Sequence, residues 1–105
     1  MDIGQIEANF GFTKAMAKLY LAGLEYGPLL MAHLAMRANV KRTTAYYVMA
    51  ELLRRGFFSK KKLGKRTGYV AASPEHVLEM TLERERQVRK LLPALNFIKK
   101  KEGAA

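Results

Sequence analysis

The stretch NVKRTTAYYVMAELLRRGFFSKKKLGKRTGYV, residues 39–70, combines a helical pattern with two segments of strand character. Its first half predicts a helix from about Lys41 to Arg55, because apolar residues recur there at helical spacing on one face: Ala45, Met49, Leu52 and Leu53. Gly56 is suited to ending this helix. The segments FFSKKK and TGYVAA have strand character and flank a turn containing Gly64, so they predict a β-hairpin.

The residues on either side extend this plan. A short helix over residues 3–10 is predicted to end at Gly11, and Thr13 can cap a second helix that ends before Gly27 and Pro28. The segment LLMAHLAMR predicts a further short helix, and Asn39 suits the turn that follows it. The sequence therefore predicts a mainly α fold with a small β-hairpin, which is a winged helix-turn-helix.

A long C-terminal helix is predicted after this domain. Ser73, Pro74 and Glu75 form a helix-start pattern, and the helix is expected to reach about Lys101 with a kink or interruption at Pro93. We expect residues 1–72 to form the winged domain and residues 73–105 to form a dimerisation element. The candidate contact residues are apolar: Leu78, Leu82, Val88, Leu91, Leu92, Leu95 and Ile98. The alternative is that this helix folds back on its own domain.

Positive charge is concentrated in one part of the chain. The formal net charge of the 105 residues is +10, and residues 37–66 contain ten Lys and Arg but a single acid, Glu51. A dense positive region attracts polyanions, nucleic acid first and anionic membrane second. The alternative is a basic surface that is simply solvated.

The candidate DNA contacts lie on the predicted third helix and on the hairpin. The helix contributes Lys41, Arg42, Thr43, Thr44 and Tyr47, which are cations and hydroxyl side chains near its start, as a helix in the major groove requires. The hairpin, or wing, contributes Lys60, Lys61, Lys62, Lys65 and Arg66, which are predicted to contact phosphates.

Other features of the sequence carry no chemistry of this kind. The two histidines, His33 and His76, have no cysteine or carboxylate cluster at ligand spacing, and we predict no catalytic residue, metal site or cofactor. No signal peptide or membrane span is predicted, so a cytoplasmic location is expected, without a membrane partner or an evident small-molecule effector. Among the hairpin aromatics Phe57, Phe58 and Tyr69, one Phe is expected to belong to the core and Tyr69 to pack beneath the wing, rather than to stack on bases. For Leu29, Met31 and Met36 the sequence allows two roles, either as part of the core or as a contact patch for a partner.

The chain resembles the TrmB-like family of winged helix-turn-helix transcription regulators, from about Phe10 to Leu95. The resemblance is carried by FGFTKAMAKLYLAGLEYGP, NVKRTTAYYVMAELLRRGFF, GYVAASPEHVL and LLPAL. It implies DNA binding as a dimer, with the five helix residues named above facing the groove and Tyr46 partly inward. Two departures are Met16, where the family often has Glu, and Lys41, where Pro, Ser or Asp is frequent. Many members continue into a sugar-sensing domain that this sequence does not include, so no response to sugar is implied.

The function predicted from sequence is site-specific binding of double-stranded DNA by a dimeric transcription regulator that is not an enzyme. Two other functions stay open. One is non-specific binding of nucleic acid by a nucleoid-type protein. The other is a winged-helix protein-interaction module, which the apolar residues of LLMAHLAMR would favour and the basic segment opposes.

Overall fold

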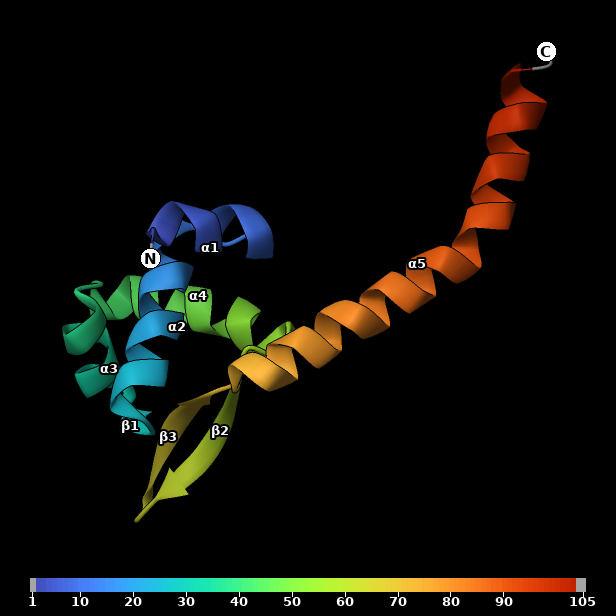
Figure 1. Ribbon diagram of the computed structural model, residues 1–105. Helices are drawn as coiled ribbons and strands as arrows, with labels where there is room; N and C mark the ends of the chain where they lie inside the picture. Colours follow the sequence, from blue (N-terminus) through green and yellow to red (C-terminus); the bar gives the residue numbers. More distant parts are fainter. Residues whose placement is uncertain (1, 104–105) are drawn as a thin grey trace. The chain divides into compact units, whose positions relative to one another are not determined.

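The computed structural model describes residues 2–103, and it confirms the predicted winged helix-turn-helix with a long C-terminal helix (Figure 1). Its elements in chain order are α1 (Ile3–Phe10), α2 (Lys14–Tyr26), β1 (Leu29–Leu30), α3 (Met31–Ala38), α4 (Arg42–Arg54), β2 (Phe58–Leu63), β3 (Arg66–Ala71) and α5 (Pro74–Gly103). They form two units, Met1–Ser73 and Pro74–Ala105.

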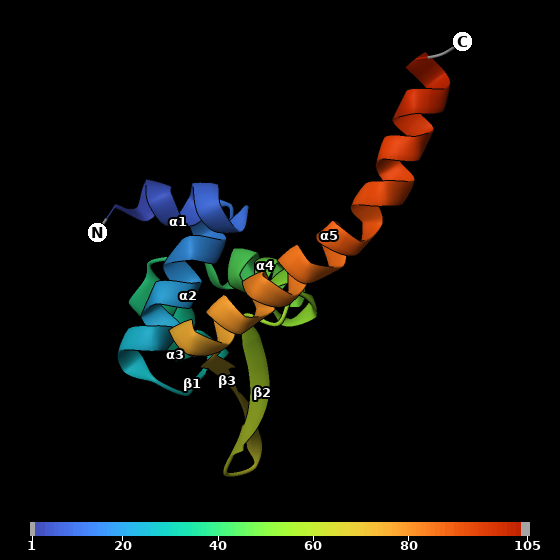
Figure 2. The same ribbon diagram turned by 45° about the vertical axis from the view of Figure 1, so that its right-hand side comes forward.

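The first unit is built on the packing of α2, α3 and α4 (Figure 2). The Thr13 hydroxyl accepts a hydrogen bond from the Met16 amide at 3.3 Å, so the predicted cap of α2 is present. The largest fully buried side chains come from all three helices: Leu19, Leu34, Met49 and Leu52. In α4, Val48 is buried and Leu53 is only half-buried, so the buried face is rotated slightly from the one predicted.

The wing belongs to a three-stranded antiparallel sheet in the order β1-β3-β2. The hairpin of β2 and β3 was predicted, whereas β1 was not, because its two residues are too few to show an alternating pattern. Leu29 pairs with Tyr69, and Leu30 pairs with Gly68. This pairing accounts for Leu29 as half-buried sheet, while Met31 is core and Met36 stays 67% exposed.

Aromatic rings fill the core between the N-terminal helices and the base of the wing. Phe12, Tyr20, Phe57 and Phe58 are buried, and Phe10 is half-buried against them. The rings of Phe12 and Phe57 meet nearly edge to face at 4.7 Å between centroids, a preferred arrangement. Both hairpin phenylalanines therefore serve the core, and neither is available to stack on bases.

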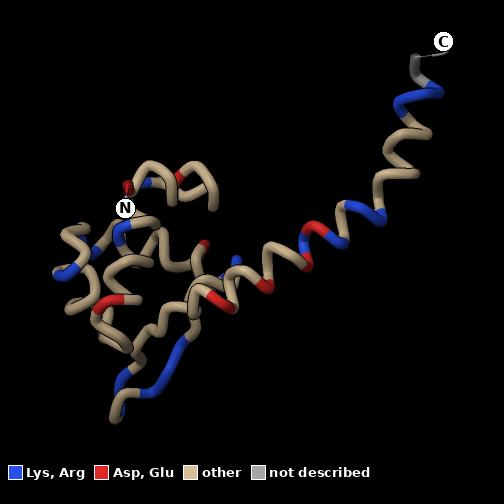
Figure 3. The backbone as a smooth tube through the Cα atoms, viewed as in Figure 1, with Lys and Arg blue, Asp and Glu red and all other residues tan. Residues whose placement is uncertain are grey.

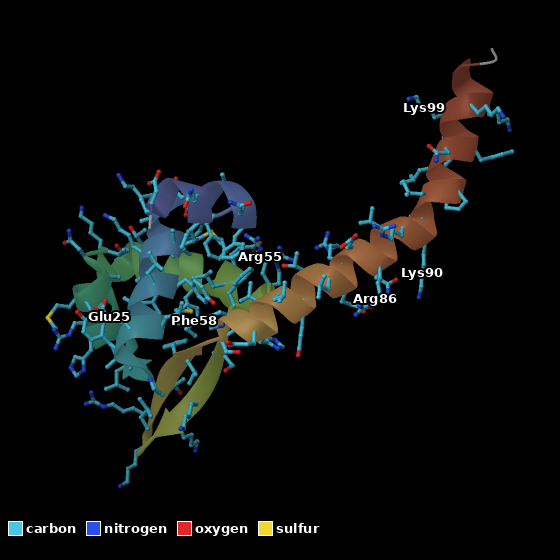
Figure 4. The ribbon with its side chains drawn as sticks, viewed as in Figure 1. Glu25, Arg55, Phe58, Arg86, Lys90 and Lys99 are labelled. Carbon is cyan, nitrogen blue, oxygen red and sulfur yellow. The ribbon has the colours of Figure 1, made fainter. Side chains whose placement is uncertain are left out.

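Two polar contacts tie distant segments to this core. The Tyr20 hydroxyl donates a hydrogen bond of 2.9 Å to the carbonyl of Ala72, which fixes the end of the wing. Arg55 donates to the carbonyls of Phe10 and Gly11, the latter at 3.2 Å, and so joins the end of α4 to the end of α1 (Figure 4). Its guanidinium also lies 5.2 Å from the centroid of the Phe12 ring.

The second unit is the helix α5, which begins at Pro74 as predicted and contains Pro93 without ending there. Figure 1 shows it bending between its orange and red parts, as the loss of one amide donor permits. Ion pairs within the helix join Glu83 to Arg86 and Glu85 to Arg89. No helix among residues 2–103 is both long and apolar enough to cross a membrane.

Candidate nucleic-acid interface

The helix-turn-helix is formed by α3, a three-residue turn at residues 39–41, and α4. Asn39 takes the left-handed conformation, with φ 56° and ψ 48°, which Asn tolerates better than most residues. The amide of Val40 donates to the carbonyl of Ala35 at 2.9 Å, which closes the end of α3. The carbonyl of Lys41 accepts from the Ala45 amide at 2.8 Å, which opens α4. The predicted turn is thus confirmed in detail.

The start of α4 presents a polar surface to solvent. Ala45, Val48 and Met49 are buried on one side of the helix. The five residues predicted to contact DNA are all exposed: Lys41, Arg42, Thr43, Thr44 and Tyr47. Tyr47 is 83% exposed, which is a high exposed fraction for an aromatic side chain. This surface combines charged and hydroxyl donors over the first two turns of one helix.

Tyr46 connects this surface to the wing. It is 49% exposed, and the Arg42 guanidinium lies 6.0 Å from the centroid of its ring. Burial raises the pKa of the Tyr69 phenol, and the neighbouring Tyr46 phenol raises it further. Since Tyr69 belongs to β3, this electrostatic effect indicates that the start of α4 lies near the base of the wing.

The basic residues of the wing point to two opposite faces. Alternate residues of a strand share a face, so Lys60 and Lys62 lie on the same face as Phe58 and as Tyr69, the cross-strand partner of Lys60. This is the face that adjoins Tyr46, and we call it the α4-side face. The opposite face carries Lys61 and Arg66, and Lys65 lies in the turn between the strands. Figure 3 shows the resulting basic hairpin.

The glycines of the wing explain part of this geometry. Gly64 has φ 65°, which suits the tight turn between the strands. A Cβ at Gly68 would lie 2.3 Å from Leu63 Cδ1, so the Leu63 side chain covers Gly68 on the face opposite α4. That face therefore contains an apolar patch between its two cations.

Not every cation of residues 37–66 belongs to this surface. Arg54 pairs with Glu51, and their hydrogen bond lowers the pKa of the Glu51 carboxyl and raises that of Arg54. Arg55 is engaged with backbone carbonyls, as described above. The other eight cations form no ion pair with a carboxylate among residues 2–103. Sequence reasoning missed the role of Arg55, because nothing in the local pattern distinguishes it from Arg54.

The described residues contain no group of three or more His, Cys, Asp or Glu able to hold a metal ion. Their polar surface is instead suited to binding a polyanion, because positive charge lies both at the start of a helix and along the adjoining hairpin. A helix-turn-helix with this surface defines a winged helix-turn-helix DNA-binding protein.

Comparison with known proteins specifies the family. Residues 6–75 match the family described as "Sugar-specific transcriptional regulator TrmB", and the chain belongs to this family. It is therefore a TrmB-like DNA-binding protein, in a family of regulators and chromatin proteins rather than enzymes. The resemblance inferred from sequence is confirmed. No curated protein sequence matches the chain significantly.

Nine chains of solved structures match. One is TrmBL2, described as an archaeal chromatin protein that shows a novel mode of DNA binding. The TM-score is 0.80 at 26% sequence identity, over 94% of the present chain. The match spans 38% of the TrmBL2 chain, so the present chain corresponds to less than half of that protein.

Proposed function

We propose that this protein is a site-specific regulator of transcription that binds double-stranded DNA as a homodimer. In this proposal the start of α4 enters the major groove, and the α4-side face of the wing contacts the flanking phosphates. The observation that carries the proposal is the exposed group at the start of α4, where Arg42, Thr43 and Thr44 adjoin an 83% exposed Tyr47. Arg can bind both acceptors of guanine, and Thr can hydrogen-bond a base and touch a thymine methyl group.

The wing supports binding but gives little selectivity. Its lysines are flexible point charges, which suit phosphate oxygens rather than a particular base. As in other helix-turn-helix proteins, α4 would then contact the bases, and the elements beside it would contact the DNA backbone.

The dimer is supported by α5, whose predicted contact residues are all between 43% and 60% exposed: Leu78, Leu82, Val88, Leu91, Leu92, Leu95 and Ile98. Phe97, which is not among the predicted contact residues, is 69% exposed. A helix with so many exposed apolar residues is stabilised when a second helix covers them. Dimerisation would also supply two copies of α4 for two half-sites.

A second candidate function is chromatin-type binding without a preferred site. It is favoured by one observation, the structural likeness to TrmBL2, which is described as a chromatin protein. The concentrated charge of the wing is equally compatible with this function. The two candidates differ in what the start of α4 contributes.

Selection from a random pool of duplex DNA, followed by sequencing of the retained molecules, tests the proposal. A recovered two-fold symmetric motif would support a dimeric regulator. Retention without a motif would favour the chromatin-type function, and failure to retain DNA at low salt would refute both.

Variants of α4 add a second test. Arg42→Ala with Thr44→Ala should lose about 1–3 kcal/mol of preference per base contact if α4 contacts bases. For a chromatin-type binder, the same variant should lose only salt-sensitive affinity. Arg54→Ala is the matched control, since Arg54 lies at the other end of the same helix and is paired with Glu51. Equal effects of the two variants would argue against a specific role for the start of α4.

A further inference from the structure

The helix α5 has a strongly asymmetric distribution of charge. Residues 75–85 contain four glutamates and one arginine, whereas residues 86–101 contain six Lys and Arg and no acid. Figure 3 shows the acidic part of α5 followed by its basic part. The helix therefore has a net negative N-terminal half and a net positive C-terminal half, and any partner that lies along it meets both.

Contacts within the helix neutralise only the middle of this pattern. Glu83 bonds to Arg86 and to Gln87, and Glu85 bonds to Arg89. Towards the two ends, Glu75 and Glu79 form no ion pair among the described residues, and neither do Lys99, Lys100 and Lys101. The charges that remain available are thus acidic at one end of the helix and basic at the other.

Exposed apolar residues occur on both halves of the helix. Leu78 and Leu82 lie on the acidic half, and Val88 lies near the middle. The basic half carries Leu91, Leu92, Leu95, Phe97 and Ile98. Leu78 and Ile98 are each ten residues from Val88, so reversing the direction of the helix about Val88 exchanges one for the other.

We infer that α5 pairs with α5 of a second copy in antiparallel orientation, centred near Val88. This inference deepens the proposed homodimer and rests on it. In this register Leu78 faces Ile98 of the second copy, and Leu82 lies close to Leu95. The stretch that contains Glu75 and Glu79 then lies alongside the lysines at residues 99–101 of the second copy, at both ends of the pair. Opposite charges at such flanking positions set the orientation in which helices pair.

Parallel pairing has the opposite electrostatics. Each residue would then lie beside its own copy, so the glutamates would meet glutamates at one end and three consecutive lysines would meet three at the other. Like charges held side by side destabilise a helix pair. The antiparallel orientation converts both of these repulsions into attractions.

The orientation has a consequence for DNA binding. Residues 78 and 98 are twenty residues apart, which is about 30 Å along a helix. Each winged unit is joined to the start of its own α5, so antiparallel pairing puts the two units at opposite ends of the pair. The starts of the two α5 helices would be separated by roughly the length of this segment, which is similar to the spacing of about 34–36 Å between two half-sites on DNA. Parallel pairing would bring both units to the same end.

Cysteine cross-linking of the full chain tests the orientation, because the sequence has no cysteine of its own. The variants are Leu78→Cys, Ile98→Cys and Val88→Cys, each treated with a short bis-maleimide. We expect Leu78→Cys alone and Ile98→Cys alone to remain uncross-linked, and an equimolar mixture of the two to give a covalent dimer. Val88→Cys should cross-link by itself, because it lies at the centre of the pair.

Each contrary result has a definite meaning. Efficient cross-linking of Ile98→Cys with itself would overturn the inference in favour of parallel pairing. Absence of cross-linking in all samples, Val88→Cys included, would remove the dimer itself. Retention of random duplex DNA by the same preparations would show whether DNA binding fails with it, so the two failures are distinguishable.

Charge reversal gives an independent measurement that does not depend on cysteine. Lys99→Glu with Lys101→Glu should weaken dimerisation about tenfold or more in sedimentation equilibrium, since the acidic stretch then lies beside a stretch that is no longer positive. Adding Glu75→Lys and Glu79→Lys to the same chain should restore it, because the two stretches then again carry opposite charges, with their signs exchanged. Failure of the four-fold variant to recover would refute the antiparallel orientation.

Discussion

Neutralising the two faces of the wing separately should have unequal effects on DNA binding. The first variant is Lys60→Gln with Lys62→Gln, which removes both charges from the α4-side face. The second is Lys61→Gln with Arg66→Gln, which removes two charges from the opposite face. Both lower the net charge by two and both keep polar side chains. Net charge alone therefore predicts equal effects, and the geometry predicts different ones.

The expected magnitude follows from the number of phosphate contacts removed. Each contact contributes about 0.9 to the slope of log affinity against log salt. Loss of Lys60 and Lys62 should therefore reduce the slope by about 1.8 per winged unit. Near 0.1 M salt this corresponds to an affinity roughly 60-fold lower for each unit. The opposite-face variant should change the slope by less than about 0.5, because its charges act only through a screened distance.

Fluorescence anisotropy on a labelled duplex, titrated at several salt concentrations between about 50 and 200 mM, measures both slopes. Circular dichroism of each variant establishes that the wing and helices remain folded. Equal slopes for the two variants would refute the reasoning, because the effect of a wing cation would then depend on net charge and not on the face that carries it. A larger effect from Lys61 and Arg66 would mean that the opposite face contacts DNA.

Three further predictions concern the scaffold that holds this surface. Arg55→Ala should lower the free energy of unfolding by about 3 kcal/mol, because it removes two hydrogen bonds of a charged donor and two cation–π contacts. A thermal melt should therefore show a Tm lower by about 15 °C. Arg54→Ala, at the exposed neighbouring residue, should have little effect, and similar losses from both variants would contradict the bridging role of Arg55. Gly23→Ala should destabilise the fold by about 1–2 kcal/mol in urea denaturation, because the added Cβ would lie 2.8 Å from Phe58 Cζ and 2.9 Å from Ala71 Cβ. The control Gly4→Ala, in α1, should be neutral or stabilising. A stabilised Gly23→Ala variant would show that the sheet can move away from α2 at little cost. Because the pKa of Tyr69 is raised in the folded state, its neutral phenol contributes stability below its unfolded pKa of about 10, and this contribution is lost as the pH rises through the folded-state pKa. Tyr69→Phe should therefore reduce the fall in the free energy of unfolding above about pH 10, measured by urea denaturation. An unchanged pH profile would exclude Tyr69 as the source of that fall.

The parts of the fold predicted from sequence are those with strong local patterns. The Thr13 cap, the Asn39 turn and the Pro74 start each depend on interactions within a few residues, so the sequence displays them directly. The β1 strand has no such pattern, since its two residues gain their strand geometry only from pairing with Tyr69 and Gly68, about forty positions away. The same holds for Phe57, whose burial depends on α1 and the Gly11 turn.

In the candidate site, too, the role of each cation depends on its contacts in the folded chain, so sequence alone does not predict it. The sequence identifies a basic segment, but a count of cations treats Arg54, Arg55 and Lys60 alike. In the folded chain Arg54 is paired with an acid, Arg55 binds backbone carbonyls, and Lys60 has no ion pair among the described residues. Their capacity to bind an anion therefore differs, although their contribution to net charge is the same. Strand alternation adds a second distinction, between cations beside Tyr69 and cations on the other face. Any difference in DNA binding between the two wing faces therefore depends on the fold and is independent of net charge.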